Sequence, residues 1–213
     1  MLGQHGRGIT RALFTGPARV LARLGVTPNM LTVAGTVATI AVAVLTLPQG
    51  RFILGPVLLL LVLIGDSFDG ILARLTGTES SFGAFLDSTM DRLADGAVFG
   101  SLAVWAALHL NPGALRTVTV AIAVTVVVLA AAVPYARARA ESVGATATVG
   151  IAERTDRLIA AGVGTVAVGL GAPTWVLTAA LAVIAVASLI TVVQRIMAVR
   201  EQLWRPGTLE ADS

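Results

Sequence analysis

The sequence predicts an all-α membrane protein whose chain crosses the bilayer six times. Of the 213 residues, 56% are hydrophobic and 13% are charged, and the mean hydropathy is +0.87. A soluble domain typically carries about 25% charged residues. The apolar residues fall into six runs, each near the roughly 20 residues that a helix needs to cross a bilayer. The chain has no cysteine, which excludes disulfides and thiolate metal sites.

An amphipathic segment, residues 1–28, precedes the first apolar run. Four of its residues are arginines that alternate with apolar side chains, and Gly16-Pro17 interrupts the pattern. This pattern is typical of a helix that lies on the membrane surface with its guanidinium groups among lipid phosphates. We therefore expect a surface helix here rather than a disordered basic leader. Because several apolar runs follow the one that begins near Met30, we interpret that run as a membrane span and not as a cleaved signal peptide.

Caps and turns set the expected boundaries of the six spans. Thr27 followed by Pro28 is a helix start, with threonine as the N-cap and proline at the first helical position. Pro134 is expected to bend the fourth span. We expect spans at about residues 29–47, 52–75, 82–110, 114–141, 152–170 and 174–200. The chain then consists of a juxtamembrane segment 1–28, a six-helix membrane domain 29–200 and a polar C-terminal tail 201–213.

The basic residues predict the orientation in the membrane. All 15 are arginine, and arginine keeps its charge in proteins. With six spans, Arg51 and Arg116 fall at one face, and the other 13 arginines fall at the opposite face with all 12 carboxylates. Positive residues gather on the cytoplasmic side, so both termini are expected there. The net charge of +3 then indicates topology and anionic ligands, and no nucleic-acid partner is expected.

Two pairs of aspartates stand at the facing ends of the second and third spans. Asp66 and Asp69 are spaced i, i+3. Asp87 and Asp91 are spaced i, i+4, so each pair projects from one helix face. Carboxylates in membrane helices are costly and usually functional. Because a short loop makes these helices antiparallel neighbours, we expect the four carboxylates to converge on hard cations such as Mg²⁺ or Mn²⁺. Two such metals would suit displacement at a phosphorus centre.

Small and basic residues accompany the aspartates. Gly70 and Ala73 keep the face of the second span small, and Gly83 does the same one turn before the third aspartate. Small residues in membrane helices often only permit close packing, and that alternative stays open for them. Arg74 faces the same expected cavity and supplies positive charge for an anionic ligand. Asp95 continues the acidic stripe, and we expect it to be a partner for an arginine.

A second group of charged residues, all arginines, is expected to hold a phosphate. Two of them begin the fifth span, where positive charge opposes the helix macrodipole and a bound anion would relieve it. The expected pocket consists of Arg137, Arg154, Arg157 and Arg195. The alternative is that arginines only anchor the cytoplasmic face, and we prefer that interpretation for Arg139, Arg200 and Arg205.

The aspartate-containing stretch also carries a family resemblance. Residues 66–91 read D-x-x-D-G-x-x-A-R, then eight residues, then G-x-x-x-D-x-x-x-D. This resembles the signature of the CDP-alcohol phosphatidyltransferases, with every signature position filled. The length and the pattern of spans extend the resemblance over nearly the whole chain. Enzymes of this family displace CMP from a CDP-linked lipid with the hydroxyl of a second alcohol. The resemblance implies a homodimer in the plasma membrane, with a polar cavity open to the cytoplasm.

The resemblance implies a role for each signature residue. Asp66, Asp69 and Asp87 would hold two Mg²⁺ or Mn²⁺ ions per active site. Asp91 would contact a metal and act as general base towards the acceptor hydroxyl. The site for CDP-diacylglycerol would be lined by Asp66, Asp69, Gly70, Ala73, Arg74 and Gly83.

Further segments point to the acceptor. The stretches FGAFLDSTMDRLADG, PYARARAE, ERTDRL and VVQR resemble actinobacterial members of the family that use inositol phosphate. Members that use glycerol phosphate more often have proline and lysine where this chain has Ser88 and Arg92. One departure is Arg137, which stands where some relatives have lysine. We therefore expect transfer of the phosphatidyl group from CDP-diacylglycerol to inositol phosphate.

Three alternatives accompany this prediction. The same chemistry could act on glycerol 3-phosphate or serine, as in a phosphatidylglycerol phosphate synthase. A membrane prenyltransferase also uses aspartate-rich motifs and magnesium, but with different spacing and on more spans. A divalent-cation transporter would need acidic residues near mid-membrane or at both ends of a path, and the expected outer face has none.

Overall fold

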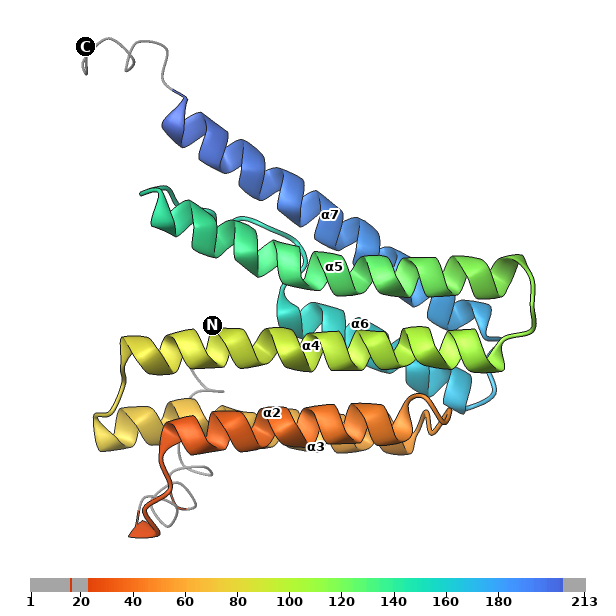
Figure 1. Ribbon diagram of the computed structural model, residues 1–213, viewed down its shortest axis with the longest axis horizontal. Helices are drawn as coiled ribbons and strands as arrows, with labels where there is room; N and C mark the ends of the chain where they lie inside the picture. The colour runs from red at the N-terminus through yellow and green to blue at the C-terminus, as the bar shows by residue number, and fades with distance from the viewer. Residues whose placement is uncertain (1–15, 17–22, 205–213) are drawn as a thin grey trace, which may run out of the picture. The chain divides into compact units, whose positions relative to one another are not determined.

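Figure 1 shows the computed structural model, which describes Gly16 and residues 23–204, with the side chains of 66–71, 75 and 76 excepted. The described residues are helical and contain no strand. Their helices are α2 (Pro28–Thr46), α3 (Leu54–Thr76), α4 (Ser81–His109), α5 (Ala114–Ser142), α6 (Arg154–Gly169) and α7 (Trp175–Leu203). Each expected span corresponds to one of these helices, which confirms the all-α class. The expected surface helix and most of the C-terminal tail lie outside the described residues.

Three of the described helices, α2, α5 and α7, are long and apolar enough to cross a membrane. α3 begins with a shorter apolar stretch, Leu54–Gly65, ahead of its aspartates. Exposed tryptophans flank α7, with Trp175 at its first residue and Trp204 just after its last. Tryptophan is enriched at membrane–water interfaces, so the two rings fit the two ends of a span. The chain is therefore an integral membrane protein.

Local sequence explains where several helices begin and end. The Thr27 hydroxyl oxygen accepts a hydrogen bond from the Met30 N–H at 3.3 Å, and Pro28 follows in the first turn, as expected. Gly77 ends α3 with a φ of 64°, a left-handed conformation that glycine adopts without steric cost. Pro134 lies inside α5, which bends along its length (Figure 1).

The chain forms two compact units, Met1–Val98 and Phe99–Ser213. In the first, α2 packs along α3. In the second, α5 and α6 both pack against α7. The hydroxyls of Thr119 and Thr178 hydrogen-bond at 2.7 Å between α5 and α7. Gly164 lets α6 approach α7 closely, because a Cβ on Gly164 would lie 2.7 Å from the Cβ of Ala180 on α7.

Candidate active site

Counted from the loop that joins α3 and α4, the four signature aspartates fall at two similar positions along their helices. α3 and α4 are antiparallel (Figure 1) and are joined by residues 77–80. Asp69 lies seven residues before the last residue of α3, and Asp87 lies six residues after the first residue of α4. At 1.5 Å per residue, both are roughly 10 Å from the loop along their helices. Asp66 and Asp91 are each ten residues from the loop end of their helices, or roughly 15 Å.

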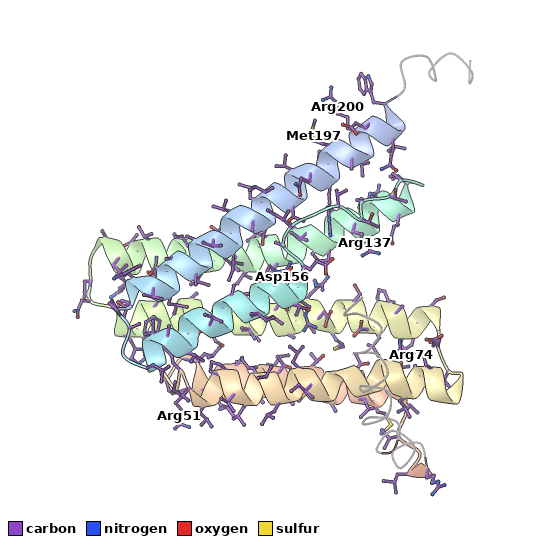
Figure 2. All side chains as sticks on the ribbon, turned by 180° about the vertical axis from the view of Figure 1, so that it is seen from behind. Arg51, Arg74, Arg137, Asp156, Met197 and Arg200 are labelled. Atoms are coloured by element: carbon purple, nitrogen blue, oxygen red, sulfur yellow. The ribbon has the colours of Figure 1, made fainter. Side chains whose placement is uncertain are left out.

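The side chains on α4 include an exposed Asp87 and a half-buried Asp91. The Asp91 carboxylate forms an ion pair with the Arg92 guanidinium at 3.6 Å. Arg74 is exposed, and Figure 2 shows it near the opposite end of α3 from Arg51. The placement of these two arginines at opposite membrane faces stays a prediction.

The metal site stays a prediction. Among the side chains that the structure describes, no three acidic or histidine residues form a cluster suited to a metal. The expected ligand set includes Asp66 and Asp69, whose side chains are not among them. Asp95 is 1% exposed on α4, and the arginine partner expected for it is also still a prediction.

Two polar residues next to Gly83 were not identified from the sequence. The Ser80 hydroxyl oxygen accepts a hydrogen bond from the Gly83 N–H at 3.0 Å, as an N-cap does. The Asn29 Oδ1 lies 3.3 Å from the position that a Cβ on Gly83 would occupy. The start of α2 therefore contributes an amide to the surroundings of a signature glycine. Its position just before an apolar helix could have identified Ser80 as an N-cap. Asn29 gave no such signal, because it is near Gly83 only in the folded chain.

The second unit brings together three of the four arginines of the expected phosphate pocket. Arg157 is 2% exposed and Arg195 is 7% exposed. The charges of Arg137 and Arg157 are close enough to repel that of Arg195, while the Glu153 carboxylate is close enough to attract it. Such a group of cations favours a bound anion, because like charges at short range raise one another's free energy. The fourth arginine, Arg154, is half-buried at the first position of α6.

Backbone carbonyls hold the two buried guanidinium groups in place. The Arg195 Nε donates a hydrogen bond to the Val149 carbonyl oxygen at 3.0 Å, and its Nη1 donates to the Val133 carbonyl oxygen. The Arg157 Nη1 donates to the Ala152 carbonyl oxygen at 3.1 Å. Arg137 is exposed near the end of α5 (Figure 2), where its Nε pairs with the Glu141 carboxylate at 3.1 Å.

The start of α6 contradicts one sequence-based argument for the phosphate pocket, namely that its arginines oppose the helix macrodipole without compensation. Glu153 is its N-cap, and Glu153 and Asp156 form a reciprocal capping box in which the Glu153 N–H donates to the Asp156 carboxylate at 3.1 Å. Carboxylates at a helix start offset the macrodipole. A bound anion is therefore not needed to relieve the arginines there, and that argument for the pocket was wrong. The burial and proximity of Arg157 and Arg195 favour the pocket instead.

Comparison with known proteins defines the class. The sequence model of the CDP-alcohol phosphatidyltransferase family matches residues 25–199, which include α2 to α6 and most of α7. The chain therefore belongs to the CDP-alcohol phosphatidyltransferase family and is an enzyme of that class.

Within this family, the chain is similar to several phosphatidylinositol phosphate synthases. The chain is 38% identical to the phosphatidylinositol phosphate synthase of Streptomyces avermitilis, covering 95% of this chain and 84% of the relative. It is 42% identical to that of Cutibacterium acnes, covering 92% and 97%. Among solved structures, it resembles the Mycobacterium tuberculosis phosphatidylinositol phosphate synthase with CDP-DAG bound, with a TM-score of 0.82, 36% identity, and 89% and 94% coverage. The same enzyme with manganese and citrate gives a TM-score of 0.81 at 36% identity, covering 87% and 88%.

Proposed function

We propose that this enzyme transfers the phosphatidyl group of CDP-diacylglycerol to inositol phosphate, forming phosphatidylinositol phosphate and releasing CMP. The observation that carries this proposal is the similarity to phosphatidylinositol phosphate synthases along nearly the whole chain. The CDP-DAG in a solved relative supports the donor. The buried arginines of the second unit support an acceptor that carries a phosphate.

The donor site in this proposal is formed by α3 and α4. Asp66, Asp69 and Asp87 are its metal ligands, two Mg²⁺ or Mn²⁺ ions fit a set of carboxylate oxygens, and Asp91 contacts one of them. Manganese in a solved relative supports a divalent metal. When bound, the metals would neutralise the diphosphate and favour displacement at phosphorus.

Signature residues without a carboxylate hold the cytidine diphosphate in this proposal. Arg74 adds charge-assisted hydrogen bonds to the diphosphate. Gly70, Ala73 and Gly83 let the nucleotide approach the helix backbone, with the Asn29 amide beside Gly83.

Asp91 is the general base in the reaction that we propose. Its carboxylate removes the proton from the acceptor hydroxyl as the hydroxyl oxygen bonds to the phosphorus of the phosphatidyl group. The bond from that phosphorus to the bridging oxygen breaks, and CMP leaves with the electron pair. The Arg92 guanidinium beside the half-buried Asp91 favours the charged form of the carboxylate, which is the form that can accept a proton.

The membrane arrangement belongs to the same proposal. All six helices span the bilayer, residues 1–28 lie on its surface, and residues 29–200 form the catalytic domain ahead of the tail 201–213. Both termini and the active site face the cytoplasm, and two copies form a homodimer. Arg51 precedes α3 and Arg74 lies in its last turn (Figure 2), as is expected if the two arginines face opposite sides of the bilayer.

An acceptor assay tests the function. Purified protein in detergent would be given CDP-diacylglycerol and Mg²⁺ with inositol phosphate, glycerol 3-phosphate or serine. We expect CMP release with inositol phosphate. Release with glycerol 3-phosphate alone would favour a phosphatidylglycerol phosphate synthase and contradict the proposal.

Replacing Arg195 by glutamine is expected to raise the KM for inositol phosphate more than the KM for CDP-diacylglycerol. Glutamine removes the positive charge, and a hydrogen bond to a charged group contributes about 1.5–3 kcal/mol, or on the order of 10- to 100-fold. Arg139→Gln is the matched control, because Arg139 is exposed and its Nη1 donates to the hydroxyl of Ser142 on its own helix. An unchanged KM for inositol phosphate in Arg195→Gln would count against the pocket.

A further inference from the structure

The last four residues before the N-cap of α6 lie against α7. This segment, 149–152, ends the connection between α5 and α6, which runs back beside α5 and α7 (Figure 1). Thr191 on α7 is 0% exposed. Its hydroxyl oxygen accepts hydrogen bonds from the backbone N–H groups of Ile151 and Ala152, both at 3.1 Å. The same hydroxyl donates to the Ala187 carbonyl oxygen at 2.9 Å, which fixes its orientation.

The carbonyl groups of the same segment hold the two buried arginines. The Val149 carbonyl accepts from Arg195, and the Ala152 carbonyl accepts from Arg157. Within this segment, the N–H groups of Ile151 and Ala152 thus bind Thr191, and the carbonyls of Val149 and Ala152 bind the two guanidinium groups. Displacement of segment 149–152 away from Thr191 would therefore remove one backbone acceptor from each of the two arginines.

Gly150 allows this close contact. Its φ is +147°, a conformation that residues with a side chain rarely adopt. A Cβ on Gly150 would clash with the Thr191 Cγ2. The backbone of segment 149–152 therefore reaches the threonine only because this position has no side chain.

We propose that Thr191 is a positioning residue for the acceptor-phosphate pocket. Its hydroxyl holds segment 149–152, and the carbonyls of that segment orient Arg157 and Arg195 towards the phosphate. This inference rests on the proposed function, because it assumes that the acceptor carries a phosphate. Recognition of a phosphate by two arginines depends on their geometry as well as their charge. A residue that fixes the orientation of both arginines therefore controls the affinity for the acceptor.

The rest of the connection has its own attachment to α7. The Gln202 side chain accepts from the Thr146 N–H at 2.8 Å and donates to the Thr146 carbonyl oxygen at 2.6 Å. Loss of the Thr191 hydroxyl is therefore expected to loosen segment 149–152 while the connection stays docked.

Three variants separate positioning from a general effect on folding. Thr191→Val keeps the shape and removes the hydroxyl, whereas Thr191→Ser keeps the hydroxyl. Thr165→Val is the matched control, because Thr165 is 2% exposed and its hydroxyl donates to the Ala161 carbonyl of its own helix. For each protein we would measure kcat, both KM values and hydrogen exchange of residues 149–152. The acceptor would be whichever of inositol phosphate and glycerol 3-phosphate the wild-type enzyme uses.

The expected result is a rise of roughly tenfold in the acceptor KM for Thr191→Val. We expect faster exchange in segment 149–152, an unchanged KM for CDP-diacylglycerol, and values near wild type for Thr191→Ser and Thr165→Val. An acceptor KM that stays unchanged in Thr191→Val, or rises equally in Thr165→Val, would overturn the inference. Wild-type preference for glycerol 3-phosphate would overturn the proposed acceptor while leaving the Thr191 comparison valid. Use of serine alone would overturn both.

Discussion

Asp91→Asn is expected to lower turnover by roughly 10²- to 10⁴-fold, the usual contribution of a general base. The asparagine amide cannot take the proton from the acceptor hydroxyl, so the attacking oxygen remains a weak nucleophile. Binding of CDP-diacylglycerol should stay measurable, because most of the proposed donor site lies on α3 and at Gly83. Turnover and lipid binding would be measured on the same purified sample.

Glu79→Gln is the control for this substitution. Glu79 is an exposed carboxylate in the loop between α3 and α4, and its neutralisation should leave turnover near wild type. Turnover of Asp91→Asn within a few-fold of wild type would remove Asp91 as the base. Loss of lipid binding together with turnover would assign Asp91 to the donor site instead.

Removal of divalent metal is expected to reduce CMP release by at least on the order of 100-fold, the size of effect seen when one group that stabilises transition-state charge is lost. The proposed ligands Asp66, Asp69 and Asp87 would then repel one another and the diphosphate. Dialysis against a chelator, followed by titration with Mg²⁺ or Mn²⁺, measures the loss and its recovery.

Sodium at matched ionic strength is the control for metal removal, since it screens charge without occupying a divalent site. Full activity after exhaustive chelation would contradict the proposed metal site. Recovery with sodium alone would show that charge screening, and not coordination, is what the carboxylates need.

The sequence predicted the helices well because caps and breakers mark their ends. Thr27-Pro28 begins α2 where expected, and a polar loop follows α3 at Gly77. The start of α6 was expected at 152 and lies at Arg154, because Glu153 and Asp156 form a capping box. An acid at the N-cap and another three residues later was the pattern that would have placed it correctly.

The sequence likewise predicted some features of the candidate site and missed others. Helical spacing alone pairs the aspartates and predicts their matching levels on α3 and α4. The contacts of Arg195 could not be predicted, because Val149 reaches it only through the path of the α5–α6 connection and Val133 only through the packing of α5 against α7. Thr191 was missed for the same reason: no periodic pattern distinguishes it from a threonine that bonds only to its own helix.

The central claim is that the phosphatidyl group passes to inositol phosphate. The most direct measurement is mass spectrometry of the lipid product, with CMP quantified in the same reaction, after purified enzyme is incubated with CDP-diacylglycerol, inositol phosphate and Mg²⁺. We predict a lipid whose mass is that of phosphatidylinositol phosphate, formed in equal amount to CMP. CMP accompanied by phosphatidic acid, or no inositol-containing lipid at all, would contradict the claim.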